Sequence, residues 1–157
     1  PDPRGYWRPR NTGRAVVYGA EGDADASIPI GATPWNALVA LRGAVMEARD
    51  KNDGPTYDKR LPYRSAVRAG GGIGVVHIVG HRLRLSLESV GPRPVTRQNT
   101  VWVDSYLDVT LEGTFVVVAE RVYLEAAVSN VLDERYVETR FSPNPGREFR
   151  VAVEARW

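Results

Sequence analysis

The C-terminal stretch Arg147-Glu-Phe-Arg-Val-Ala-Val-Glu-Ala-Arg-Trp157 decides the fold class, because apolar and polar side chains alternate along it. Successive side chains of a β-strand point to opposite faces, so a period of two predicts a strand. One face of this strand carries Arg150, Glu154 and Arg156. The other face is apolar and carries Phe149, Val151, Val153, Ala155 and Trp157.

The same alternation recurs upstream, most clearly in segments 82–88, 101–117 and 122–129. It is weaker in 14–28 and in 66–76, where glycines leave one face thin. Residues 36–47 suit a strand or a helix, because their Ala, Leu and Arg favour a helix whereas the neighbouring strands favour a strand. We expect an all-β chain of about seven or eight long strands, in which residues 1–13 are the remains of one strand.

The connections between these strands alternate in length. In an antiparallel up-and-down meander, alternate connections lie at the same end of the sheet, so one end should carry large loops and the other tight turns. Membrane β-barrels show this asymmetry, with long loops outside and short turns in the periplasm. The expected long or moderate connections are 48–65, 90–100 and 131–146, and the shorter ones are 29–35, 77–81 and 119–121.

Composition narrows the functional classes. The chain has 157 residues, a net charge of +2 and no cysteine, which excludes disulfides, thiol catalysis and cysteine–metal sites. The sequence has no basic tail or stripe of the kind that would indicate a nucleic-acid partner. The longest apolar runs are five residues, 37–41 and 115–119, whereas a membrane-spanning helix needs about 20. The chain starts with Pro1 and no apolar leader follows it, so we expect a piece of a longer protein.

Alternation alone suits two environments, because the apolar face of a sheet can meet a soluble core or lipid. Three features favour the membrane barrel: the strands are long, Trp157 ends an alternating strand, and the polar faces mix both signs of charge. A hydrated lumen can solvate and pair such charges. The lumen-facing residues we expect are Arg82, Arg84, Glu88, Asp104, Asp108, Glu112, Glu125, Arg150 and Glu154.

The last third of the chain resembles a known family. The run Asn130-Val-Leu-Asp-Glu-Arg-Tyr136, then Pro145-Gly-Arg-Glu-Phe149 and a terminal aromatic, resembles the last two strands of TonB-dependent outer-membrane receptors. Leu61-Pro62-Tyr63, Val103-Asp104 and Tyr18-Gly19-Ala20-Glu21 resemble further marks of that family. The resemblance covers about 14–157 and is strong over 100–157. Val131-Leu132 departs from the usual Leu-Phe, and Ala20 stands where a larger apolar residue is common.

The resemblance implies a function. Such receptors import iron–siderophore complexes, cobalamin or similar scarce nutrients across the outer membrane of Gram-negative bacteria, through a barrel of about 22 strands that an N-terminal plug closes. A chain of 157 residues is too short for that barrel, so we expect residues 1–157 to form its C-terminal segment. The implied partners are the outer-membrane bilayer, the remaining barrel and plug, the TonB energy-coupling complex and the barrel-assembly machinery.

The resemblance also assigns roles to residues. Phe149, Val151, Val153, Ala155 and Trp157 look like the C-terminal signal that the barrel-assembly machinery recognises. Loops 48–65 and 131–146 are the candidate ligand-contacting surface. The residues that match the family motif are Asn130, Leu132, Asp133, Tyr136, Pro145, Gly146 and Arg147.

Other features give no catalytic site, and we expect neither an enzyme nor a cofactor. His77 and His81 would suit a metal on a helix, but we interpret them as parts of a tight turn. Asp104, Asp108 and Glu112 are spaced four residues apart on one expected strand, so neighbouring members lie about 13 Å apart, which is too far for a catalytic acid pair.

A free-standing eight-stranded barrel, in the membrane or soluble, remains the alternative to a segment of a larger barrel. A segment of a larger barrel should form an open curved sheet, or an artificial closure of the 143–157 strand onto the first strand. A closed barrel in regular register would count against the segment.

Overall fold

The computed structural model describes residues 13–119, 121–139 and 142–157, and these form an all-β chain. Residues 1–12, most of the expected N-terminal strand remnant, lie outside the described residues. None of the described residues belongs to a helix long and apolar enough to cross a membrane. The strands are β1 (Ala15–Pro29), β2 (Trp35–Asp50), β3 (Val67–His77), β4 (Arg82–Val90), β5 (Arg93–Pro94), β6 (Trp102–Val103), β7 (Tyr106–Val118), β8 (Val122–Ser129), β9 (Val137–Thr139), β10 (Ser142–Pro143) and β11 (Glu148–Ala155).

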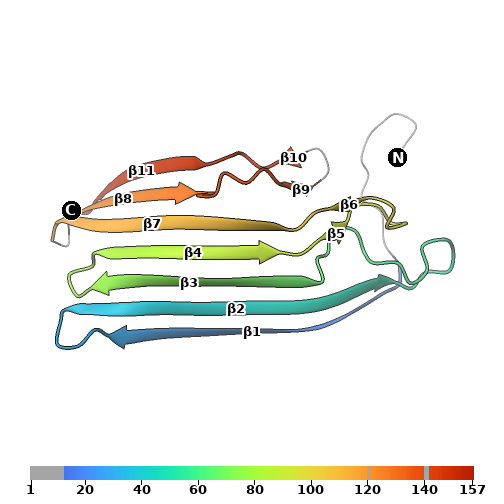
Figure 1. The fold of residues 1–157 in the computed structure, drawn as a ribbon, viewed down its shortest axis with the longest axis horizontal. Helices are drawn as coiled ribbons and strands as arrows, with labels where there is room; N and C mark the ends of the chain where they lie inside the picture. The colour runs from blue at the N-terminus through green and yellow to red at the C-terminus, as the bar shows by residue number, and fades with distance from the viewer. Residues whose placement is uncertain (1–12, 120, 140–141) are drawn as a thin grey trace.

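Seven of these strands form one antiparallel sheet in the order β1-β2-β3-β4-β7-β8-β11, shown in Figure 1. Each strand pairs with the next long strand along the chain, so the sheet is an up-and-down meander, as predicted. Two small ribbons, β5–β6 and β9–β10, lie within its long connections. Strands β1 and β11 are the two edges, and the described strands do not close into a barrel.

The sequence period located most strands, with two differences. The ambiguous segment 36–47 is the strand β2, which continues to Asp50 because loop residues pair with its end. The predicted single strand over 101–117 is wrong at its start. Its first residues form β6, which pairs with β5, and β7 begins only at Tyr106. Asp104 therefore lies in the link between two strands and is off the strand face that carries Asp108 and Glu112.

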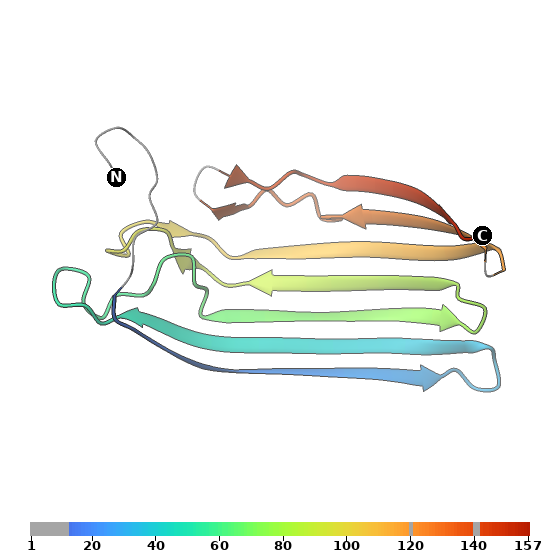
Figure 2. The ribbon, with the colours of Figure 1, turned by 180° about the vertical axis from the view of Figure 1, so that it is seen from behind.

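The two ends of the sheet differ, as the loop lengths predicted. The turns 30–34, 78–81 and 119–121 lie at one end, together with the C-terminus (Figures 1 and 2). The opposite end carries three long connections. We call residues 51–66 the first loop, residues 91–105 the second loop and residues 130–147 the third loop.

The two faces of the sheet have opposite chemistry. A continuous apolar row crosses all seven strands through directly paired residues: Ala26, Val39, Ile73, Leu85, Leu111, Val128 and Phe149. This apolar face is uncovered, with Leu41 64%, Ile73 61% and Val151 72% exposed. Figure 2 shows the same single layer from behind. Among the described residues no second large sheet covers the apolar face.

The opposite, polar face has a bare strip along β3. Gly70, Gly72 and Gly74 lie on this face, opposite Glu88, Ser86 and Arg84 of β4. A Cβ at Gly70 would lie 2.7 Å from Arg42 Nε, and one at Gly72 would lie 3.1 Å from Arg84 Nε. The glycines thus leave room for two arginine side chains to lie over the β3 backbone.

Candidate functional site

The long-loop end of the molecule holds most of the buried residues that the structure describes. The central strands expose both faces, whereas this end buries apolar and polar groups together. The buried residues are Ala48, Asp50, Ser65, Val90, Arg93, Pro94, Val95, Tyr106, Asn130 and Tyr136. The three loops are therefore packed against one another, and this packed end contains both candidate ligand-contacting segments, 48–65 and 131–146.

The first loop folds back along the end of β2. Asp50 N donates to Lys59 O at 2.9 Å and Leu61 N donates to Ala48 O at 2.8 Å, so the loop extends the sheet. This pairing sets Arg49 opposite Arg60. Two like charges side by side are unfavourable unless an anion lies between them.

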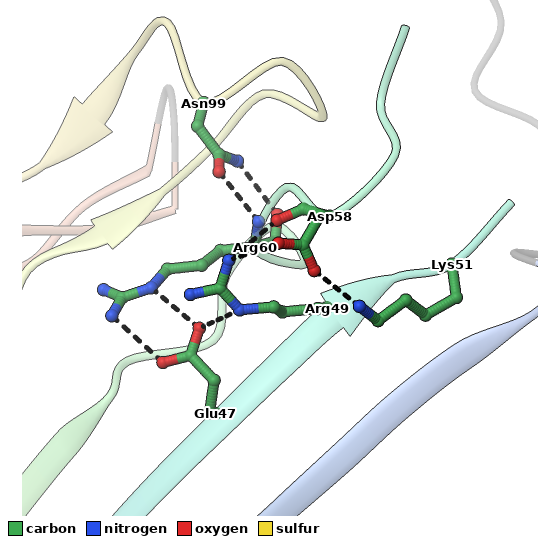
Figure 3. A network of polar contacts seen from close by, with 6 residues as sticks. All are labelled: Glu47, Arg49, Lys51, Asp58, Arg60 and Asn99. Carbon is green, nitrogen blue, oxygen red and sulfur yellow. Dashed lines mark hydrogen bonds and ion pairs between the residues drawn. The ribbon is translucent and has the colours of Figure 1, made fainter. Parts of the chain in front are cut away.

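Glu47 supplies that anion, as Figure 3 shows. Its Oε1 accepts from Arg49 Nε at 3.0 Å and from Arg60 Nε at 3.1 Å, and its Oε2 accepts from Arg60 Nη2 at 3.0 Å. The carboxylate and both guanidinium groups are only 17–35% exposed. The network is therefore a partly buried cluster of charges, and it begins two residues after the apolar residue Val45 of β2.

Asp58 closes the network on its other side. Its Oδ1 accepts from Lys51 Nζ at 2.6 Å and its Oδ2 accepts from Arg49 Nη1 at 3.2 Å. The hydrogen bond from Lys51 holds the pKa of Asp58 below its ordinary value, and the same bond raises the pKa of Lys51. Both groups are therefore charged at neutral pH.

Side chains of the second loop bond to the first loop and to the end of β2. Asn99 Oδ1 accepts from Arg60 N at 2.8 Å, and Asn99 Nδ2 donates to Arg60 O at 2.9 Å. Asp50, only 3% exposed, accepts from Arg97 Nη2 at 2.8 Å and from Thr56 Oγ1 at 3.0 Å. Sequence period gave no signal for the contacts of Asn99 and Arg97, because their partners lie 39 and 47 positions away.

The family-like motif assembles the third loop. Asn130, only 2% exposed and in a left-handed conformation (φ 49°), accepts from Glu134 N and donates to Glu134 O, both at 2.9 Å. Asp133 Oδ1 accepts from Arg147 N at 2.9 Å. Gly146 allows this approach, because a Cβ there would lie 2.8 Å from Asp133 Oδ1. These motif residues thus have structural roles; Leu132 is 54% exposed and Pro145 is also exposed.

Tyr136, the last residue of the first motif segment, stacks on Tyr106 at the start of β7. The ring centroids lie 3.9 Å apart and the planes differ by 5°. Burial raises the pKa of Tyr136 to about 12. With Val90, the two tyrosines form a small buried cluster under the third loop. Sequence analysis assigned Tyr136 to the motif and missed its partner Tyr106.

The predicted lumen-facing residues, apart from Asp104, all lie on the polar face of the sheet. Glu112 pairs across the strands with Arg84, and Asp108 with Glu88. Glu88 also accepts from Arg42 at 3.5 Å and from Arg68 at 3.2 Å. The other members of this face are Arg82, Glu125, Arg150 and Glu154, which pair across the strands with Thr114, Thr114, Ala127 and Tyr123.

The polar face is hollowed in two adjoining places. One hollow of about 440 Å³ is lined by Glu21, Asp23, Arg42, Arg68 and Glu88, among others. The second, about 410 Å³, is lined by Asp23, Asp25, Arg42, Arg84 and Glu112, among others. Both are charged and shallow. They can accept a polar surface that carries charges of both signs.

The two histidines lie in the 78–81 turn or directly before it, as interpreted from the sequence. His77 Nδ1 accepts from Val79 N at 3.2 Å and His81 Nδ1 accepts from Val116 N at 3.1 Å. Trp35 contacts His77 edge-on at 4.7 Å. No group of three or more possible metal ligands occurs in the part of the chain that the structure describes.

Comparison with known proteins supports the fold and gives no family. No family model matches the sequence, and no curated protein matches it. Among solved structures, the chain is similar to the ferric yersiniabactin uptake receptor FyuA from Yersinia pestis, with a TM-score of 0.71 and 21% identity. The match covers 90% of this chain and 23% of that receptor. At this identity the likeness supports the fold alone, and this chain spans about a quarter of the receptor's length.

Proposed function

We propose that this chain is the C-terminal part of the barrel of a TonB-dependent outer-membrane receptor that imports a scarce nutrient, such as an iron–siderophore complex or cobalamin. One observation carries the proposal: a single-layer sheet exposes a continuous apolar row on one face and charges on the other. Water disfavours such a layer, because large apolar patches are rarely left uncovered. Lipid outside and a hydrated lumen inside satisfy both faces.

The dimensions of the apolar face agree with a bilayer. Along β2 the outward residues are apolar or small from Trp35 to Val45, and charged from Glu47 onward. Ten positions at about 3.3 Å each give about 33 Å along the strand. A strand tilt of about 40° reduces this to about 25 Å, the height of the apolar band in membrane barrels. Trp35 at one limit suits an interfacial aromatic girdle.

The open edges support a segment of a larger barrel. Unpaired backbone at β1 and β11 would be untenable in lipid, so further strands must pair with both edges. The similarity to 23% of a transport receptor agrees with this reading. The remaining barrel and plug of the same receptor are thus the first partners, and the TonB complex would act through the plug-bearing part.

The barrel-assembly machinery is a further proposed partner. Phe149, Val151 and Val153 are 69–74% exposed on one face of the edge strand β11, and Ala155 continues that face. Trp157 lies two residues beyond the end of β11 and is fully exposed. An exposed edge strand with alternating side chains can be recognised by the addition of a partner's strand, which would suit the barrel-assembly machinery.

The test uses the whole protein that contains this chain. It should be produced in a Gram-negative host that lacks its own siderophore and cobalamin receptors, and uptake of a panel of radiolabelled ferric siderophores and cobalamin should be measured. We expect energy-dependent uptake of at least one compound, abolished by an uncoupler, and heat-modifiable migration of the protein from the outer-membrane fraction. A chain that folds alone as a closed barrel, with no uptake, would favour the free-standing alternative.

A further inference from the structure

Arg93 is a charged residue buried where the second loop meets the third. Only 6% of it is exposed. Its Nη2 donates to Val137 O at 3.2 Å and to Glu138 O at 2.8 Å, and its Nε donates to Glu138 O at 3.3 Å. One side chain of the second loop therefore holds two consecutive backbone carbonyls of β9 in the third loop.

The positive charge of Arg93 has no direct carboxylate partner among the residues that the structure describes. Its Nη1 also has no hydrogen-bond partner there. Its guanidinium lies 5.4 Å from the ring centroid of Tyr106, which stacks on Tyr136. Burial of an unpaired charge opposes the hydrogen bonds and ring contacts that hold it. Water would solvate the guanidinium if this contact opened.

The second loop is joined on its other side to the first. Tyr63 N donates to Pro94 O at 2.7 Å, directly beside Arg93. Ser65 Oγ donates to Gly91 O at 3.0 Å, and Arg97 pairs with Asp50. Since Asn99 also bonds to Arg60, residues 91–99 contact the first loop at three places and the end of β2 through Asp50, while Arg93 holds the third loop. The two candidate ligand-contacting loops, which follow different strands of the sheet, are connected through this middle loop.

We propose that Arg93 acts as a latch: it holds residues 134–139 of the third loop in place, with Tyr136 stacked on Tyr106, and release of this contact loosens the first loop through residues 91–99. The inference goes beyond nutrient transport, since it concerns how the three loops move and holds for any ligand. Its energetic basis is the balance between three charge-assisted hydrogen bonds and one buried charge that forms no ion pair with any described residue.

Hydrogen–deuterium exchange on the folded protein tests the latch. Arg93→Met keeps the length of the side chain and removes its donors and charge. We expect amide exchange over residues 134–139 to rise at least about tenfold, because hydrogen bonds from a charged donor are lost, and exchange over residues 59–63 to rise at least about threefold by coupling through the second loop. Arg135→Met is the matched control, since Arg135 is an exposed arginine in the same loop, and it should change neither segment.

Three outcomes would overturn the proposal. Unchanged exchange over 134–139 in Arg93→Met would show that Arg93 does not hold the third loop. A rise confined to 134–139 would show that the first loop is independent. A uniform rise across β4, β7 and β8 would make Arg93 a general packing residue. If Arg93→Met does not fold, Arg93→Lys is compared with Arg135→Lys instead. Lysine keeps the charge and can reach one carbonyl. We therefore expect a smaller rise in amide exchange over residues 134–139 and 59–63.

Discussion

Asn130 shapes the start of the third loop through its own side chain. It adopts a left-handed conformation that asparagine tolerates better than most residues, and its amide satisfies both backbone groups of Glu134. Asn130→Ala leaves these buried groups unpaired. We expect a loss of about 2–4 kcal/mol in the free energy of unfolding, measured by urea titration of the detergent-folded protein.

Leu132 is the control for Asn130, because it belongs to the same motif and is half exposed in the same loop. Leu132→Ala should change the free energy of unfolding by no more than about 0.5 kcal/mol. Equal losses in the two variants would show that the motif stabilises the loop by its apolar side chains, and would contradict the role assigned to the asparagine amide.

Tyr136 gives the loops a pH dependence at the alkaline end. Its pKa is raised from 10.0 to about 12 in the folded protein, so the folded state holds its proton more tightly than the unfolded state. This contribution to stability is complete below pH 10 and falls as the pH rises from 10 to about 12. The difference in tyrosinate absorbance between the native protein and Tyr136→Phe should titrate near pH 12 and, after denaturation, near pH 10. A native transition near pH 10 would mean that Tyr136 is exposed.

At the scale of the element, β3 is the thinnest strand of the sheet. Its glycines let neighbouring backbone and arginine side chains approach closely, and the approach is tightest at Gly74, where a Cβ would lie 2.5 Å from Leu83 O. A carbonyl in a paired strand cannot move away without breaking the ladder. A methyl group at this position must therefore displace one strand against the other.

Gly74→Ala tests this packing against Gly22→Ala in β1, where a Cβ would meet nothing within 4 Å. We expect Gly74→Ala to lower the free energy of unfolding by about 1–3 kcal/mol. The midpoint of urea unfolding should fall accordingly. Gly22→Ala should be neutral or slightly stabilising, because alanine costs less entropy than glycine in a strand. Similar effects of the two substitutions would show that β3 has room for side chains.

Sequence period predicted the elements well and their contacts poorly. Val151 and Leu85 revealed their strands because alternation is a local property, and the residue pairs confirm one apolar face. Arg93 instead lies in the run Gly91-Pro-Arg-Pro94 within the expected connection 90–100, where nothing indicates burial, since its partners lie 44 and 45 positions away. Asp104 was assigned to the wrong place because the alternating pattern runs on from Val103 into β7. In the structure Val103 ends β6, which pairs with β5, and Asp104 lies in the link before β7. Loop packing depends on such distant contacts, which no local pattern encodes.

At the scale of the whole molecule, the two faces of the sheet should respond oppositely to charge. Ile73 is 61% exposed at the middle of β3, so an aqueous surface would accept arginine there at little cost. In a bilayer the same arginine costs about 2–4 kcal/mol near the midplane. We expect Ile73→Arg to lower the stability of the protein refolded in lipid vesicles by this amount, measured by denaturant titration.

Thr110→Arg is the matched control, because Thr110 lies on the polar face of β7 at mid-strand, opposite Ser86. It should cost less than about 1 kcal/mol, since a hydrated lumen solvates arginine. Equal tolerance of both substitutions would argue that neither face meets lipid and would count against the membrane proposal.

The strands of the sheet differ in length in a systematic way. β1 and β2 have 15 and 16 residues, whereas β8 and β11 have 8 each. At about 3.3 Å per residue, one side of this wall is roughly twice as tall as the other, and the surplus lies at the long-loop end. In the barrel proposed above, such a wall would give an oblique rim of paired strands that is higher on the β1–β2 side. On the β8–β11 side the third loop, with its β9–β10 ribbon, would stand where paired strands end.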